Sequence, residues 1–252
     1  MKADLIAYGP IISNETWYSD KEQKNVIFPN KFNEALAELK EGDELNVYVN
    51  SPGGDVFAAV AISSQIKRAR SKGVKVNAFI DGVAASAASF LVMACDSVSA
   101  YQSSMLMIHK PMSVAFGNAL EMRSTAETLD NIEESSMLPL YESKAKLDME
   151  DVKTAIAKET WLGAEAMSEM FDITVISDVE PKSTDAQAMA KAMLKDYSNS
   201  YKHMPENLIE DSTPIDTQGE PPKEPEQAPQ DDSSFIYALR KIKNDIENIK
   251  EN

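Results

Sequence analysis

Short apolar segments alternate with segments of helical periodicity along the first 197 residues. Apolar runs with strand character lie at 5–12, 45–49, 74–80, 97–101, 105–108 and 173–176. Helical patterns occupy the intervals at about 31–40, 56–70, 84–95, 118–146, 149–158 and 164–170. Strands that alternate with helices form βαβ units around a parallel sheet. The pattern therefore predicts a layered α/β domain over residues 1–197.

The helix predicted at 118–146 is longer than a compact domain of this size needs, so we expect it to protrude. Its apolar residues are Leu120, Leu129, Ile132, Met137 and Leu140. A protruding helix with an apolar side favours contact with a neighbouring subunit. We therefore expect a homo-oligomer larger than a dimer.

The pattern changes after residue 197. Residues 198–232 are predicted to form an acidic, proline-rich linker, because the part from 206 to 232 has nine carboxylates, one lysine and five prolines. Such a segment has too little apolar surface to offset the entropy lost on ordering. Residues 233–252 then show one amphipathic heptad stripe, formed by Phe235, Leu239, Ile242, Ile246 and Ile249. A helix this short is marginal alone, so the stripe predicts a coiled-coil partner.

Composition and charge exclude several classes of function. The net charge of −16 argues against nucleic-acid binding, which needs clustered Lys and Arg. A single cysteine, Cys95, excludes an internal disulfide framework and favours a reducing, cytoplasmic location. Two histidines and one cysteine leave no set of ligands for structural zinc, and we expect neither a metal nor a cofactor. No apolar run approaches the roughly 18 residues that cross a bilayer, and no secretory signal is present.

Three short segments carry candidate chemistry. The first, YVNSPGGDV at 48–56, is a strand that enters a Pro-Gly-Gly turn, where paired glycines allow another backbone to come close. It is not a phosphate-binding loop, because both the Walker ending and the GxGxxG spacing are missing. In the second, DGVAASAASFLVMAC at 81–95, Ser86 stands where a strand gives way to a helix of small residues. A serine at such a turn lies beside free N–H groups that can bind an oxyanion.

The third segment, SSMLMIHKP at 103–111, is an apolar strand that ends at His109. Single residues of this kind are more often structural than catalytic. The only other histidine, His203, borders the polar tail and is a poor site candidate. If a serine nucleophile has a histidine base in this chain, that base is His109.

In this order, the three segments resemble the proteolytic subunit of the Clp protease, ClpP. The matching residues are SPGG at 51–54, GVAAS at 82–86 and MIHKP at 107–111. The resemblance covers about residues 4–180 and includes YGPI at 8–11 and AKETWLGAEAMSEMFDIT at 157–174. It implies the ClpP/crotonase-like α/β fold and a serine endopeptidase. The most similar variants are phage and prophage enzymes such as head maturation (prohead) proteases, in which ETW precedes the last helix and strand.

The resemblance implies a role for each matching residue. Ser86 is the nucleophile, His109 is its general base, and the backbone N–H groups of Gly54 and Ala87 form the oxyanion hole. The third member of the triad, an aspartate in ClpP, is matched by Glu159, which precedes Trp161 and Leu162. Asp172 and Asp151 remain alternatives for that role. An extended substrate is expected to pair through its main chain with a strand beginning at Asp55 and Val56 and with the segment after Pro111. Gly53 is a further candidate for substrate binding.

Departures from ClpP favour the phage type of enzyme, acting without ATP on capsid and scaffold proteins in the host cytoplasm. The chain starts almost at its first strand, so we expect no axial gate for an unfoldase. Ser86 is followed by Ala87 and Ala88 instead of Met-Gly. The linker and the terminal helix have no counterpart in the housekeeping enzyme, and the helix is a candidate handle for a scaffold or capsid partner. The resemblance also implies self-association into heptameric or stacked rings.

Three alternatives stay open. The chain is a housekeeping-like ClpP subunit that works with an unfoldase, an acyl-CoA enzyme of the crotonase family, or an inactive capsid assembly or scaffolding protein. A crotonase would more often show catalytic carboxylates in place of Ser86 and His109. An intact serine and histidine at the expected positions argue against an inactive protein.

Overall fold

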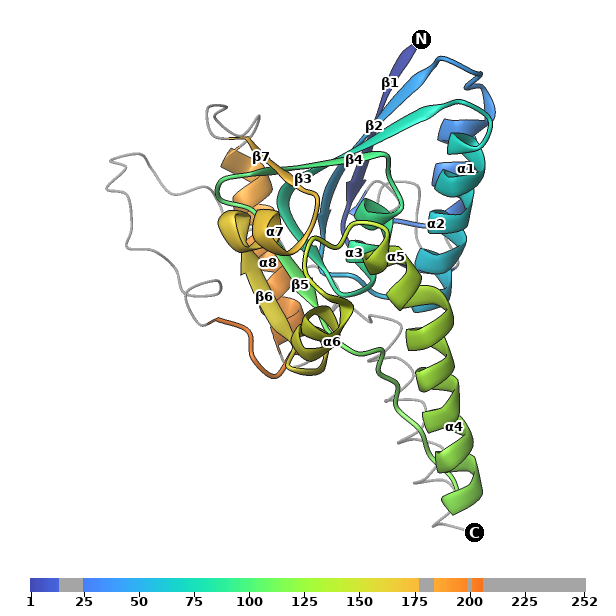
Figure 1. The fold of residues 1–252 in the computed structure, drawn as a ribbon, viewed down its shortest axis with the longest axis vertical. Helices are drawn as coiled ribbons and strands as arrows, with labels where there is room; N and C mark the ends of the chain where they lie inside the picture. Colours follow the sequence, from blue (N-terminus) through green and yellow to red (C-terminus); the bar gives the residue numbers. More distant parts are fainter. Residues whose placement is uncertain (14–24, 177–183, 199–200, 206–252) are drawn as a thin grey trace, which may run out of the picture. The chain divides into compact units, whose positions relative to one another are not determined.

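A seven-stranded sheet organises the part of the chain that the computed structural model describes, residues 1–13, 25–176, 184–198 and 201–205 (Figure 1). Its main path is parallel and runs β1-β2-β3-β4-β7. Strand β5 pairs with β3 in parallel, and β6 pairs with β5 in antiparallel fashion. The strands are β1 (Lys2–Tyr8), β2 (Glu44–Ser51), β3 (Lys75–Ala85), β4 (Ser97–Tyr101), β5 (Met105–Ile108), β6 (Thr160–Gly163) and β7 (Thr174–Ile176). The mixed α/β architecture predicted from the sequence is confirmed.

Strand β3 is the longest strand and has two different neighbours on the same edge. Its first half pairs with β4, from Asn77 opposite Ser97 onward, and its last three residues pair with β5. The sequence predicted that this strand ends near residue 80, but it continues to Ala85. This extension carries the chain directly to the second motif and places β5 beside it.

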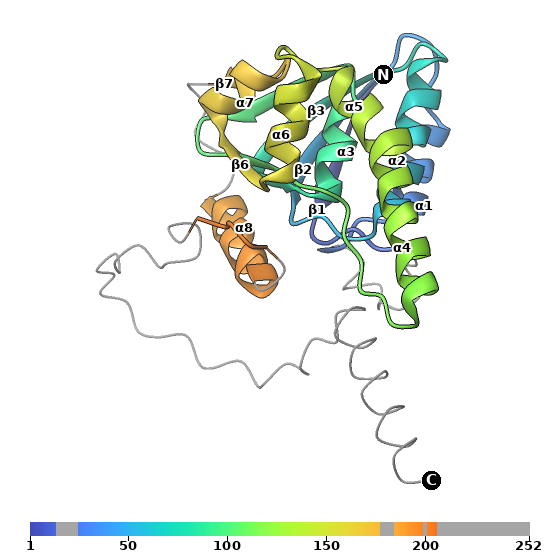
Figure 2. The ribbon, with the colours of Figure 1, turned by 60° about the horizontal axis from the view of Figure 1, so that its bottom comes forward.

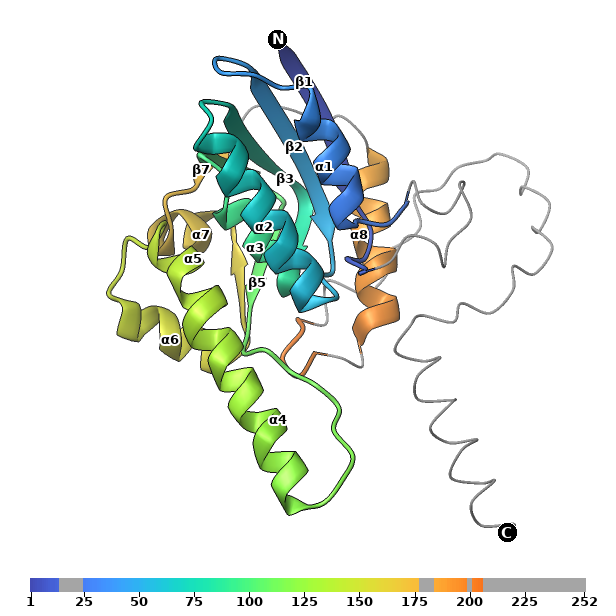
Figure 3. The ribbon, with the colours of Figure 1, turned by 90° about the vertical axis from the view of Figure 1, so that its right-hand side faces the viewer.

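Helices α1 (Pro29–Ala37), α2 (Val56–Arg70) and α3 (Ala87–Met93) pack over the main core on one face of the sheet (Figure 3). Helix α8 (Thr184–Tyr197) contacts β3 and β2. Alternate residues of a strand point to opposite faces. Ala84 belongs to the main core, whereas its neighbours Val83 and Ala85 cluster with Leu194 of α8. Helix α8 therefore covers the opposite face of β3, a role that the sequence patterns did not predict.

The predicted long helix is a continuous rod that ends earlier than expected. It consists of α4 (Ala119–Ile132), a π-helical turn (Glu133–Met137) and α5 (Leu138–Glu142). Asn118 and Glu121 form a capping box at its start, and α4 projects from the sheet and its covering helices (Figures 1 and 2). Helices α6 (Met149–Ala157) and α7 (Ala164–Met170) follow it.

Most of the apolar residues of this rod are not available to a neighbouring subunit. Ile132, Met137 and Leu140 are buried, and the last two belong to the main core. Leu129 is half-buried, and Leu120 is 73% exposed. The expectation that all five residues serve a subunit contact is therefore wrong, because three of them stabilise the chain's own fold.

Part of the predicted linker packs against the domain. Residues 201–205, placed by the sequence in the linker, cluster with the domain through Tyr201 and Met204. The remaining linker, 206–232, and the predicted helix at 233–252 lie outside the described residues. Within the described residues, no helix is both long and apolar enough to cross a membrane.

Candidate active site

Ser86 lies at the turn between β3 and α3 in a strained backbone conformation. Its φ of 54° and ψ of −126° are unusual for a residue with a side chain. Neighbouring groups hold it there: the Ser86 N–H donates to the Met107 carbonyl at 2.9 Å, and the Ser89 hydroxyl donates to the Ser86 carbonyl at 2.6 Å. Such a strand-to-helix turn exposes the serine hydroxyl at the carboxyl end of the strand.

The buried hydroxyl of Tyr141 supports this turn from behind. Tyr141 Oη lies 2.7 Å from Ser89 Oγ. Since the single hydroxyl proton of Ser89 is directed to the Ser86 carbonyl, Tyr141 is the donor in this second hydrogen bond. A chain of two hydrogen bonds therefore runs from α5 through α3 to the backbone of Ser86.

His109 follows β5 directly, and sheet pairing brings it to Ser86. Residues 83–85 of β3 pair with residues 105–107 of β5 in register. Beyond this register, His109 Nε2 lies 2.7 Å from Ser86 Oγ. Burial lowers the pKa of His109, while the nearby Glu159 carboxylate raises it. Because burial is the larger effect, the imidazole is neutral near pH 7 and its Nε2 can accept the hydroxyl proton.

The Pro-Gly-Gly turn packs directly against the Ser86 backbone. A Cβ on Gly53 would lie 2.6 Å from the Ala85 carbonyl oxygen and 2.8 Å from Ser86 Cβ. Gly53 also has a φ of 92°, in the region that favours glycine. Ile11 fixes the turn, since its N–H donates to the Gly53 carbonyl at 2.8 Å and its carbonyl accepts from the Asp55 N–H at 2.9 Å. The structure thus brings the first motif beside the second.

The two N–H groups expected to bind an oxyanion flank this contact. Ala87 is the first residue of α3, so its N–H has no partner within the helix. The Gly54 N–H follows Gly53 in the turn that abuts Ser86. Both N–H groups belong to the backbone, so the fold fixes their positions before substrate binds, which is what an oxyanion hole requires.

The expected substrate-binding strand at Asp55 and Val56 is absent from the described structure. Val56 begins α2, and the Asp55 carboxylate caps that helix by accepting from the Ala58 N–H at 2.7 Å. The expected strand is not formed because α2 starts at this position, whereas the role of Asp55 and Val56 in substrate binding stays a prediction. Pro111 lies in a segment without helix or strand that runs from His109 to Gly117.

Glu159 lies near His109, but its carboxylate is bound elsewhere. Its two oxygens accept hydrogen bonds from the backbone N–H groups of Lys202 and His203, at 2.9 Å and 2.8 Å. The φ of Glu159 is 53°, which is rare for a residue other than glycine. Asp151 and Asp172 are exposed, and no described contact joins either of them to His109.

Tyr201 is a site residue that the sequence patterns missed. Its ring lies edge-on to His109, with 6.0 Å between ring centroids, and edge-on to Trp161, at 5.5 Å. Its hydroxyl donates to the Pro52 carbonyl of the Pro-Gly-Gly turn. The available signal was a tyrosine, with Met204 three residues later, in a segment assigned to the polar linker.

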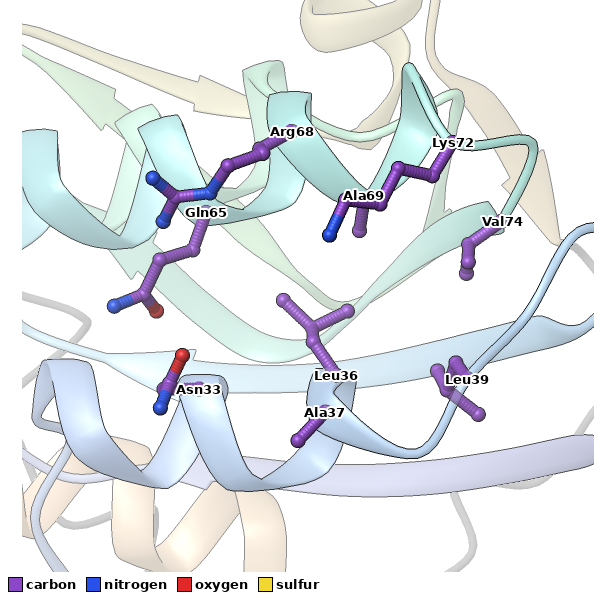
Figure 4. A pocket seen from close by; sticks show the side chains of 9 residues that line it. All are labelled: Asn33, Leu36, Ala37, Leu39, Gln65, Arg68, Ala69, Lys72 and Val74. Atoms are coloured by element: carbon purple, nitrogen blue, oxygen red, sulfur yellow. The ribbon is translucent and has the colours of Figure 1, made fainter.

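Other reactive groups lie away from this site. Cys95 is fully buried, and burial raises the pKa of its thiol to about 12, so the thiol stays protonated. Among the described residues, no group of three His, Cys, Asp or Glu side chains could hold a metal ion. A separate pocket lies between α1 and α2 and contains no residue of the serine–histidine site (Figure 4). It is lined by Asn33, Leu36, Ala37, Leu39, Gln65, Arg68, Ala69, Lys72 and Val74.

Comparison with known proteins accounts for this arrangement. The Clp protease family matches residues 22–202, well over half of the sequence and including all three motifs. This chain belongs to the Clp protease family. The resemblance noted in the sequence ended at about residue 180. The family match extends to residue 202 and therefore includes Tyr201.

Several relatives carry the name of the proteolytic subunit. The ATP-dependent Clp protease proteolytic subunit of Bacteroides thetaiotaomicron is 28% identical over 145 residues, which cover 56% of this chain and 64% of that protein. A protein of the same name from Bacteroides fragilis is also 28% identical, over 56% of this chain and 68% of its own length. Subunit 1 from Prochlorococcus marinus is 26% identical over 140 residues, with 55% and 69% covered. The chain thus spans less than two thirds of the first relative's length.

Proposed function

We propose that this chain is a serine endopeptidase in which Ser86 attacks the peptide carbonyl and His109 acts as general base. The observation that carries the proposal is the 2.7 Å separation of Ser86 Oγ and His109 Nε2 at a strained strand-to-helix turn. Membership of the Clp protease family supports the same reaction.

The proposed reaction follows from the positions of the side chains. His109 Nε2 takes the hydroxyl proton as Ser86 Oγ adds to the substrate carbonyl. The N–H groups of Gly54 and Ala87 stabilise the negative oxygen that forms. His109 then gives the proton to the departing amine, and water hydrolyses the acyl-enzyme by the same steps in reverse order. Neither a metal nor a cofactor takes part in this scheme.

Glu159 is proposed as the third, acidic member of the site. Its support is electrostatic, since its charge raises the pKa of His109 and so stabilises the imidazolium that forms during the reaction. Asp151 and Asp172 have weaker support, because both are exposed and neither contributes to the pKa shift of His109.

The substrates proposed for this enzyme are phage capsid and scaffold proteins, processed without ATP during head maturation. Support comes from the sequence, through the ETW motif, the acidic linker and the heptad stripe at 235–249. The alternative is a partnership with an unfoldase, which the name of the relatives, ATP-dependent Clp protease, favours. We expect deletion of residues 206–252 to leave cleavage of a short peptide intact and to reduce processing of an assembly substrate. Equal processing by both forms would remove the proposed role of the tail.

Self-association into rings is proposed from family membership and from exposed apolar residues. Phe116 is 83% exposed and Leu120 is 73% exposed, at the tip of the rod formed by α4. Exposed apolar groups that lie close together on a surface mark an interaction site. Replacing both by glutamate is expected to lower the mass measured by light scattering, whereas Leu147→Glu, at a separate exposed position, is the matched control. A monomeric wild-type protein would contradict the proposal.

Hydrolysis of unstructured protein tests the proposed function directly. The purified full chain is incubated without nucleotide with casein and with co-expressed capsid and scaffold candidates, and the products are identified by mass spectrometry. We expect Ser86→Ala to abolish internal cleavage, and Ser64→Ala, an exposed serine on α2, to leave it unchanged. Cleavage that persists in Ser86→Ala would refute the proposed nucleophile. Absence of cleavage in the wild type would favour the crotonase-like or the inactive scaffold alternative.

A further inference from the structure

The segment after α8 returns to the catalytic residues and contacts three elements that surround them. Tyr201 packs against His109 at the end of β5 and against Trp161 of β6. Its hydroxyl bonds Pro52 in the turn that abuts Ser86. The next two residues donate their N–H groups to Glu159. Residues far apart in the sequence are thus connected around one imidazole.

His109 needs such a support, because a base of this kind works only when its ring is held in one orientation. In a serine–histidine–acid triad, a carboxylate does this by accepting from Nδ1–H. Among the described contacts, the one hydrogen bond of the His109 side chain goes to Ser86. The Glu159 oxygens accept from two backbone N–H groups, and no described hydrogen bond joins them to His109. The orienting contact that remains is the edge-on ring of Tyr201.

The ring of Tyr201 is itself fixed at both ends. Its hydroxyl is bound to the Pro52 carbonyl, and its face or edge meets Trp161. The indole N–H of Trp161 is buried without a hydrogen-bond partner, so packing is what holds that ring in place. Ser86 stays partly accessible, which means that the segment supports the site without covering the nucleophile.

We propose that Tyr201 is a positioning residue for His109, and that Glu159, besides the effect of its charge on the base, anchors the backbone beside Tyr201. The proposal rests on the proposed peptidase function and assigns the orienting role to the chain beyond α8. The groups facing the imidazole are Ser86 from the β3–α3 turn, Glu159 before β6, and Tyr201. Of these, Glu159 is the charged one.

Two substitutions separate the ring of Tyr201 from its hydroxyl. Tyr201→Phe keeps the ring against His109 and loses the hydrogen bond to Pro52, so kcat should fall by only about 10-fold or less. Tyr201→Ala removes the support, and misplacement of a catalytic group by about 1 Å costs on the order of 10²-fold in kcat. KM should change little, because Tyr201 orients the base and does not bind substrate. Tyr48→Ala, which removes an aromatic ring stacked on Phe79, is the control.

The titration of His109 provides a second readout, independent of turnover, of the contact between Tyr201 and the imidazole. His203→Gln leaves His109 as the only histidine, so its ring signals can be followed by NMR without ambiguity. In that background, Tyr201→Ala exposes the imidazole to water, and the pKa of His109 should rise toward the ordinary value. Tyr201→Phe and Tyr48→Ala should leave the pKa of His109 unchanged.

A double-mutant cycle tests the anchoring role of Glu159. If Glu159 anchors the segment, the loss of kcat in the double variant Glu159→Ala/Tyr201→Ala should be smaller than the two single losses combined, since both substitutions release the same contact. Fully additive losses would show that Glu159 does not act through Tyr201 and would overturn the anchoring role. An unchanged pKa of His109 and an unchanged kcat in Tyr201→Ala would overturn the proposal itself.

The proposal can fail independently of the peptidase function. If the wild type shows no Ser86-dependent hydrolysis, the proposed function fails, and the NMR titration still decides whether Tyr201 supports His109. If Tyr201→Ala does not fold, Tyr201→Leu retains apolar bulk against Trp161 while removing the aromatic contact. We expect Tyr201→Leu to fold and to raise the pKa of His109, and an unchanged value would count against the proposal.

Discussion

The imidazole of His109 is positioned on its two sides by different kinds of contact. On one side, the pairing of β3 with β5 sets its position relative to Ser86, and the Ser86 N–H is bonded to the strand that carries the histidine. On the other side, the ring of Tyr201, more than 20 residues after the last described strand, packs against the imidazole, and the next residue along the chain binds Glu159. Backbone pairing places reacting atoms firmly, whereas the second side depends on a segment near the end of the domain. We therefore expect substitutions on the first side to lower activity at least as much as those on the second.

The largest effect is expected where the Pro-Gly-Gly turn meets Ser86. Gly53→Ala introduces a Cβ within 3 Å of the Ala85 carbonyl and of Ser86 Cβ, at a φ that disfavours side chains. We expect kcat/KM to fall by about 10²-fold or more, because the oxyanion hole and the nucleophile shift together. Steady-state hydrolysis of a fluorogenic peptide measures the loss.

Gly42→Ala is the matched control for this substitution. Gly42 has a φ of 84°, but a Cβ there would meet nothing within 4 Å. It should therefore cost about 1 kcal/mol of stability through backbone strain and leave kcat/KM unchanged. Similar activity in the two alanine variants would show that the close approach of Gly53 has no role in catalysis.

An intermediate effect is expected in the pH dependence of the reaction. Burial lowers the pKa of His109, so the acid limb of kcat/KM should lie below the ordinary histidine pKa of about 6.5. Glu159→Gln removes the charge that raises this pKa, and the limb should move further toward acid. Tyr201→Ala should move it in the opposite direction by exposing the ring. A shift of both variants in the same direction would break the distinction between the two groups.

The same pKa shift predicts a stability effect with a defined sign. Since the pKa of His109 is lower in the folded than in the unfolded chain, the unfolded chain binds more protons between the two values. The free energy of unfolding should therefore fall as the pH drops through the unfolded pKa and should level off below the folded one, as far as His109 contributes. His109→Gln should remove this contribution, measured by urea unfolding at several pH values.

The smallest effect is expected at the hydrogen bond between Tyr141 and Ser89, which supports the turn that carries Ser86. Tyr141→Phe removes the hydroxyl that donates to Ser89, and a buried hydrogen bond of this kind contributes about 1 kcal/mol to stability. Urea unfolding should show this loss, with kcat reduced less than 10-fold or so, because Ser89 still donates to Ser86. A loss as large as that of Gly53→Ala would show that Tyr141 does more than support the turn.

The sequence predicted those helices and strands whose position depends on the local spacing of apolar residues. Strands β4 and β5 and helices α2 and α7 lie where periodicity placed them, since apolar spacing and flanking turn residues define each one. The sequence also predicted that Ser86 and His109 belong together, and the structure brings them within hydrogen-bonding distance. These residues lie at the ends of neighbouring strands, where topology alone brings side chains close.

The remaining features depend on tertiary contacts that no local pattern reveals. Strand β6 is four residues long and gains its partner from β5 across more than 50 residues of sequence. Helix α8 packs through Leu194 on a face of β3 that the pattern assigned to no particular helix. Tyr201 reaches His109 only because α8 ends beside β5 and β6. Glu159 was found by resemblance, whereas its hydrogen-bond partners come from the segment predicted to be linker.

Covalent labelling of the nucleophile tests the central claim most directly. The full chain is treated with a fluorophosphonate, and the site and rate of modification are read by intact-mass and peptide mass spectrometry. The account predicts one adduct per chain, on Ser86, that is absent in Ser86→Ala and formed at least about 10²-fold more slowly in His109→Ala. Ser64→Ala should label like the wild type. Labelling of Ser86→Ala at the wild-type rate, or an unchanged rate in His109→Ala, would contradict the assignment of this pair as nucleophile and base.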